Sequence, residues 1–89
     1  MSPTVETYEC RVLLCPETEG DATGFYILAL DLPGTVSQGE TEEEALAQIQ
    51  DALQCVIAVY RESGDVIPWE PVDFDPVEGA KEFVVRVQV

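Results

Sequence analysis

Histidine is absent from this chain of 89 residues, and Lys81 is its single lysine. Without histidine there is no Ser-His-Asp or Cys-His nucleophile pair, and most zinc sites lose a usual ligand. A lone lysine gives little support for a phosphate-binding loop or a Schiff base. The composition therefore argues against most catalytic classes, and we assign no catalytic residue, no metal ligand and no cofactor.

Positive charge is equally scarce, because 18 acidic residues face only 4 basic ones and the formal net charge is −14. Such a chain does not bind a phosphate backbone by counterion release, and an anionic membrane surface repels it. No apolar run approaches the length of a membrane span, and residues 1–7 lack the positive region of a signal peptide. We expect a cytoplasmic protein that binds neither nucleic acid nor membrane directly.

The cysteines number three, Cys10, Cys15 and Cys55, with no CxxC spacing. An odd count with these spacings is a poor basis for disulfides. Cys10 and Cys15 face opposite sides of any strand that they share, which also argues against a metal pair. We predict that all three are buried free thiols of a reducing compartment.

Negative charge is concentrated between residues 12 and 60, where nine acidic residues occur with no lysine or arginine. Two interpretations are open. The segment is either a solvated surface that keeps the protein soluble, or an acidic face that steers a basic partner.

Hydrophobic patterning predicts three strands before a helix. Breakers and acidic residues indicate a loop after the first strand, and Pro33-Gly34 fits a type II turn before the third. The expected elements are a strand over residues 8–14, a loop over 15–21, a strand over 25–30, a turn over 32–35 and a short strand over 35–38.

A helix is predicted from residue 42 to residue 62. Thr41 with Glu44 forms a capping box, and Ser63-Gly64 marks the end. Apolar residues follow at helical spacing, namely Leu46, Ile49, Leu53, Val56, Ile57 and Tyr60. Residues 65–82 read as a proline-rich connection, and residues 83–89 read as the last strand.

The expected architecture is one α+β domain over residues 1–89, in the order β-β-β-α-β, with a flexible N-terminus at residues 1–7. One helix covers only one face of an antiparallel sheet. Apolar candidates for the other face are Leu13, Tyr26, Leu28 and Val84. Either they form a homo-oligomer interface, or Trp69 and Phe74 cover them.

Four segments together resemble the HicB family. They are the aromatic strand with its D-L-P-G turn (24–34), the S-Q-G-E-T step (37–41), the E-E-A-L helix start (43–46) and the later G-D-V-I-P (64–68). The resemblance implies a truncated relative of the ribonuclease H fold. It also implies the antitoxin half of a toxin–antitoxin pair, whose partner is a small basic RNA-cleaving toxin. Many members carry a C-terminal DNA-binding module; we see none after the last strand, so we expect no direct operator binding.

A non-enzymatic, protein-binding antitoxin is the function that we predict. The proposed partner-binding residues are the acid-flanked turn and the helix start, namely Asp31, Leu32, Pro33, Gly34, Glu40, Glu43 and Glu44. One alternative is an orphan homo-oligomeric domain.

A more remote alternative is a metal-dependent nuclease that uses Glu9, Asp31, Glu40 and Glu44. We disfavour it because Asp31 suits a turn, Glu44 caps the helix, and the net charge repels nucleic acid.

Overall fold

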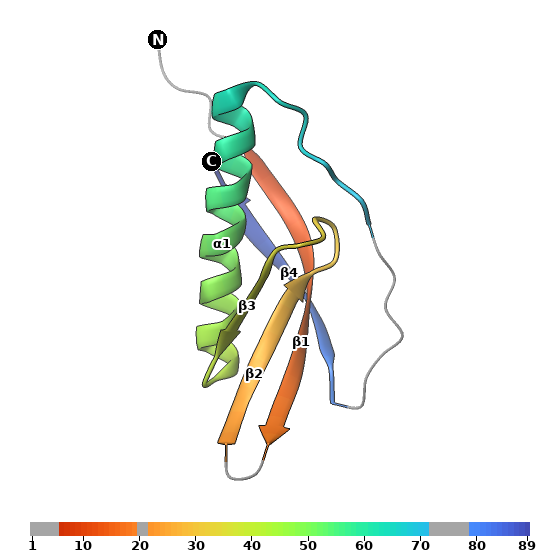
Figure 1. Ribbon diagram of the computed structural model, residues 1–89, viewed down its shortest axis with the longest axis vertical. Helices are drawn as coiled ribbons and strands as arrows, with labels where there is room; N and C mark the ends of the chain where they lie inside the picture. The colour runs from red at the N-terminus through yellow and green to blue at the C-terminus, as the bar shows by residue number, and fades with distance from the viewer. Residues whose placement is uncertain (1–5, 20–21, 72–78) are drawn as a thin grey trace.

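The computed structural model describes residues 6–19, 22–71 and 79–89 (Figure 1). In these ranges the chain forms β1 (Thr7–Glu19), β2 (Ala22–Ala29), β3 (Val36–Gly39), α1 (Glu42–Ser63) and β4 (Lys81–Gln88). The strands pair antiparallel in the order β3-β2-β1-β4, and α1 covers one face of the sheet (Figure 1). The predicted α+β class and the β-β-β-α-β order are confirmed. Among the described residues, no helix is long and apolar enough to cross a membrane.

The first strand is longer than predicted. The prediction of a loop over residues 15–21 is wrong for residues 15–19, which belong to β1. β1 continues through Pro16, which lies opposite Phe25 of β2. The β1–β4 ladder ends at the Leu14–Lys81 pair, so the alternation of the strand turns the proline nitrogen toward a side without a ladder. Pro16 therefore costs the sheet no hydrogen bond.

The turn between β2 and β3 has the predicted form. Gly34 has a φ of 96°, and the Thr35 N–H donates to the Leu32 carbonyl over 3.4 Å. Glycine adopts this positive φ without the steric cost of a Cβ, as a type II turn requires.

The first described residue and the last residue pair beside the sheet. Glu6 and Val89 exchange two backbone hydrogen bonds of 3.1 and 3.0 Å, and Thr7 begins β1. The predicted flexible N-terminus otherwise falls on residues 1–5, which lie outside the described residues. Much of the predicted connection, including Phe74, also lies outside them.

The ends of α1 follow from the sequence. The Thr41 hydroxyl accepts from the Glu44 N–H over 3.1 Å, and Gly64 ends the helix with a φ of 76°. Its buried side chains are Ala45, Ile49, Leu53 and Ile57, which recur at every fourth position along one face.

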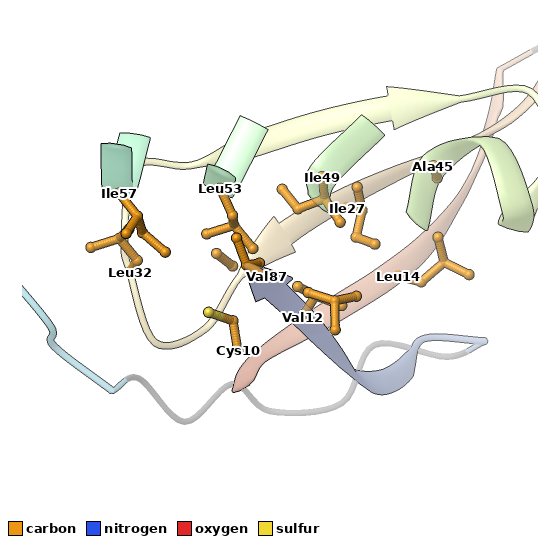
Figure 2. Close-up of a cluster of buried hydrophobic side chains, with 12 residues drawn as sticks. Cys10, Val12, Leu14, Ile27, Leu32, Ala45, Ile49, Leu53, Ile57 and Val87 are labelled. Atoms are coloured by element: carbon orange, nitrogen blue, oxygen red, sulfur yellow. The ribbon is translucent and has the colours of Figure 1, made fainter. Parts of the chain in front are cut away.

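The main core lies between α1 and the sheet, and Figure 2 shows its side chains gathered between the two layers. Leu14 and Ile27 of the sheet lie beneath Ala45 and Ile49, while Leu32 and Ile57 close the other end (Figure 2). A second cluster, Leu13, Cys15 and Leu30, lies apart from it. Alternation along β1 therefore sends Cys10 to the main core and Cys15 to the second cluster, as predicted.

The third cysteine differs from the prediction. Cys55 is exposed, whereas Cys10 and Cys15 are buried. Cys55 lies two positions from both Leu53 and Ile57, which are buried, and two positions turn a helix by about 200°. Its side chain therefore points away from the core.

Candidate functional site

All four cationic side chains bind groups of the same molecule. The contacts run along β1, β4 and the C-terminal half of α1, and one reaches the first turn of α1. They join Arg11 to Asp31 (2.9 Å) and Glu82 (3.7 Å), Lys81 to Glu42 (3.0 Å), Arg86 to Glu9 (3.6 Å), and Arg61 to the Val89 carbonyl (2.7 Å). The chain's few positive charges thus contact groups of the same molecule, and Lys81 alone among the four reaches the start of α1.

A cleft with three carboxylates opens where β3 passes into α1. We call it the acidic cleft; its volume is about 460 Å³. Glu17 comes from the end of β1, Glu40 follows β3, and Glu44 stands in the first turn of α1. The full lining is Glu17, Gly24, Phe25, Ser37, Gln38, Gly39, Glu40, Glu44 and Gln48, which includes no cation.

Gly39 sets the distance between β3 and the start of α1. A Cβ at this position would lie 2.5 Å from the Ala45 nitrogen and 2.9 Å from its Cα. Real Cβ atoms essentially never come so close to backbone atoms. The absence of a side chain at Gly39 therefore holds the helix start, with Glu40 and Glu44, against the sheet.

Three carboxylates, one of them a member of the cleft lining, crowd the first turn of α1 beside the acidic cleft. Glu42, Glu43 and Glu44 occupy the first turn of α1, where they complement the positive end of the helix dipole. Lys81 binds Glu42, while Glu43 and Glu44 are exposed. A cationic side chain at this cleft would be attracted by the carboxylates of its lining.

The predicted partner-binding residues do not form one surface. Glu40 and Glu44 line the acidic cleft, and Glu43 is exposed on the adjoining turn. The Asp31–Gly34 turn lies at the opposite end of β3, which the four-residue strand separates by about 13 Å. Figure 1 shows the turn and the start of α1 at opposite ends of β3.

Asp31 has a structural role inside that turn. Its carboxylate accepts from the Arg11 backbone N–H over 2.9 Å and from the Arg11 Nε over 3.0 Å. It thereby takes the place of a ladder carbonyl where β2 has ended, and only 18% of its side chain is exposed. Leu32 is buried, whereas Pro33 and Gly34 are exposed. Within the turn, little of the predicted acidic contact is accessible.

The predicted oligomer residues lie on the face opposite α1, with unequal exposure. Leu13 is buried in the second cluster at 7% exposure, and Leu28 packs partly against it. Tyr26 and Val84 are 39% and 62% exposed. Val36 of β3, at 66%, is also exposed on this face. It was not among the predicted residues, although its position opposite Leu28 in the β2–β3 hairpin places it there.

A smaller hollow of about 280 Å³ lies beside the start of β1, lined by Tyr8, Glu9, Asp31, Trp69 and Pro71. The Tyr8 and Trp69 rings pack with their centroids 5.8 Å apart. Trp69 was one of the two side chains predicted as an alternative cover for the face opposite α1, whereas Tyr8, on which it packs, lies against the main core. The Tyr8 hydroxyl donates to Glu6 over 2.6 Å, and this hydrogen bond raises the pKa of the tyrosine.

The four carboxylates considered for nuclease chemistry do not converge on one point. Glu9 and Asp31 line the smaller hollow, whereas Glu40 and Glu44 line the acidic cleft. Within residues 6–19, 22–71 and 79–89, no group of three potential metal ligands lies together. Two-metal catalysis requires carboxylates around cations about 4 Å apart. The described side chains offer no such arrangement.

Comparisons with known proteins point to one group. The chain is 42% identical over 50 residues to antitoxin HicB 2 of Photorhabdus laumondii, a match that covers 56% of this chain and 36% of that protein. It is 37% identical over 57 residues to antitoxin HicB of Escherichia coli K12, covering 64% of this chain and 39% of the relative. These matches thus span well under half the length of each curated relative. No protein-family model matches the chain.

Among solved structures, the N-terminal domain of antitoxin HicB from Burkholderia pseudomallei resembles this chain with a TM-score of 0.65. The match covers 88% of this chain and 95% of that domain, at 19% sequence identity. At this identity the likeness shows the fold.

Proposed function

We propose that this chain, which is HicB-like in sequence and fold, is an antitoxin-type module that inhibits a toxin by binding it. The partner that fits is a small, basic, RNA-cleaving protein, and both would work in the cytoplasm. Inhibition of this kind needs a contact surface and no catalytic group.

The acidic cleft is the observation that carries the proposal. Its three carboxylates, Glu17, Glu40 and Glu44, face solvent with no lysine or arginine in the lining. Arg11, Arg61 and Arg86 are bound elsewhere in the molecule, and Lys81, which reaches the helix start, is bound by Glu42. An arginine or lysine of the toxin would enter the cleft and bind these oxygens.

Charge complementarity also explains how the pair would meet. A chain of net charge −14 attracts a basic protein from a distance, which raises the association rate. The acidic cleft then provides a defined contact, with Phe25 in its lining as an apolar surface for an aliphatic stem. Exposed Glu43 on the adjoining turn extends the same acidic surface.

Co-expression tests the proposal. The reading frames beside this gene are searched for a short basic one, which is expressed from an inducible promoter, with and without this chain, while growth and messenger RNA integrity are followed. We expect growth arrest and RNA loss without the chain, and recovery with it as a stable complex. If no basic neighbour exists, or if the neighbour is not bound, the antitoxin proposal fails and the orphan homo-oligomeric domain takes its place.

A further inference from the structure

β4 is an edge strand, and the backbone groups on its outer side have no neighbouring strand among the described residues. It pairs with β1 on one side only (Figure 1). The Glu6–Val89 pair exchanges both hydrogen bonds, which sets the phase of the ladder. Every second residue counted back from Val89 turns its N–H and C=O groups toward β1, namely Val87, Val85 and Phe83. Glu82, Val84, Arg86 and Gln88 turn theirs outward.

In the part of the chain that the structure describes, few contacts reach the outer side of this edge. The Gln50 side chain donates to the Arg86 carbonyl over 2.6 Å from outside, which agrees with the outward direction of that group. Val84 in the middle of the strand is 62% exposed. β4 runs for eight residues with no proline, whereas natural edge strands are usually short, kinked or covered. An edge of this kind is suited to adding another strand.

We propose that β4 pairs antiparallel with β4 of a second copy of this chain, centred on Val84. In this register each Glu82 stands opposite Arg86 of the second copy, and the two Val84 side chains meet on the two-fold axis. Opposite charges across an antiparallel pair stabilise it, and so does an apolar pair. The contact is self-complementary, as a two-fold interface requires. This inference does not rest on the proposed antitoxin function.

Other registers lack this complementarity. A pair centred on Glu82 or on Arg86 places two like charges opposite each other. A register centred on Val85 places Val84 opposite Arg86 and Glu82 opposite Gln88 of the second copy. It contains no ion pair. Only the register centred on Val84 places opposite charges on both sides of an apolar centre.

The ion pairs that Glu82 and Arg86 make within one chain do not prevent their pairing with a second copy. Glu82 lies 3.7 Å from an Arg11 nitrogen and Arg86 lies 3.6 Å from Glu9. The side chains of Glu82 and Arg86 are 55% and 70% exposed, so these contacts contribute little and rearrange readily. The Arg86 carbonyl has two lone pairs and accepts from the second copy while it keeps Gln50.

The hollow beside the edge is compatible with a second copy. It measures about 340 Å³ and is lined by Gln50, Gln54, Arg86 and Gln88. Antiparallel pairing about a two-fold axis places both α1 helices on the same face of an eight-stranded sheet, so these hollows flank the junction. Their amide side chains add no negative charge where two acidic chains must approach.

Sedimentation and hydrogen exchange of the whole chain test the pairing. We expect sedimentation to give twice the 9.8 kDa mass at high concentration, with a reversible shift to the monomer on dilution. The amides of Glu82, Val84 and Arg86 should gain protection as the dimer forms, while those of Phe83 and Val85 are protected throughout. A chain that stays monomeric at millimolar concentration contradicts the proposal. A dimer that leaves the three outward amides unprotected contradicts it as well.

Two sets of variants separate the β4 edge from the rest of the open face. Val84→Lys places two like charges at the centre and should raise the dimer Kd by about tenfold or more. Val36→Lys is the matched control, because Val36 is equally exposed but lies on the far edge strand, and it should leave Kd unchanged. Glu82→Arg and Arg86→Glu should each weaken the dimer, and the double exchange, at unchanged net charge, should restore it. Circular dichroism checks that each variant folds; a folded Val84→Lys that dimerises like wild type refutes the register.

Discussion

Replacing Gly39 by alanine tests how closely α1 lies against β3. The new Cβ would stand 2.5 Å from the Ala45 nitrogen, against about 3.4 Å for an ordinary contact, so the helix start would have to withdraw by about 0.9 Å. The atoms in the way are backbone, which no rotamer change relieves. Overpacking costs about 1–3 kcal/mol, and a clash with backbone belongs at the upper end of that range. We therefore expect a loss of about 3 kcal/mol.

Urea unfolding followed by far-ultraviolet circular dichroism measures this loss. With a slope of about 1–1.5 kcal/mol/M for a chain of this size, the midpoint should fall by roughly 2–3 M. Gly24→Ala is the matched control in the same cleft, because its Cβ would meet the Gly39 carbonyl at an ordinary 3.4 Å. The control should stay within about 0.5 kcal/mol of wild type. If Gly39→Ala is equally stable, the close approach that places Glu40 and Glu44 is refuted.

Three further predictions follow from single contacts. Thr41→Ala removes the helix cap and should lower the unfolding free energy by about 1 kcal/mol in urea melts; Thr41→Ser should restore it. Asp31→Ala removes the carboxylate that accepts from the Arg11 N–H and Nε and should cost about 2 kcal/mol in the same assay, so a loss below about 0.5 kcal/mol would show that the contact is dispensable. Iodoacetamide should modify Cys55 rapidly in the native protein but Cys10 only after unfolding, because Cys10 is buried and burial raises the pKa of its thiol; equal rates by mass spectrometry would contradict this.

Local patterns were sufficient for most of the fold. The capping box at Thr41, the glycine stop at Gly64 and the Pro33-Gly34 turn are short-range signals, and the structure contains all three. Pro16 was misread because a proline is compatible with a strand only where its nitrogen has no ladder partner. That condition depends on where β4 begins, some 65 residues later. Sequence pattern alone does not contain that register.

The candidate site was predictable only in part, for a similar reason. Glu40 and Glu44 are close in sequence, and the helix cap fixes their positions. The β1–β2 register brings Glu17 into the acidic cleft. Asp31 does not line this cleft, and its carboxylate binds Arg11, which lies 20 residues earlier in the sequence. Cys55 is different, since the helical period already places it away from the core.

Binding of the basic partner to charge-neutralised variants tests the central claim most directly. The cleft variant carries three changes, Glu17→Gln, Glu40→Gln and Glu44→Gln. The control removes the same net charge from exposed positions outside the acidic cleft, by Asp51→Asn, Glu62→Gln and Glu70→Gln.

Isothermal titration at fixed salt compares both with wild type. Three exposed ion pairs at about 0.5–1 kcal/mol each amount to about 1.5–3 kcal/mol. The cleft variant should therefore bind the toxin with a Kd raised roughly 10- to 150-fold, while the control changes Kd by less than about threefold. Equal losses in both variants would mean that only the overall charge matters, and unchanged binding by the cleft variant would contradict the assignment of the acidic cleft as the toxin site.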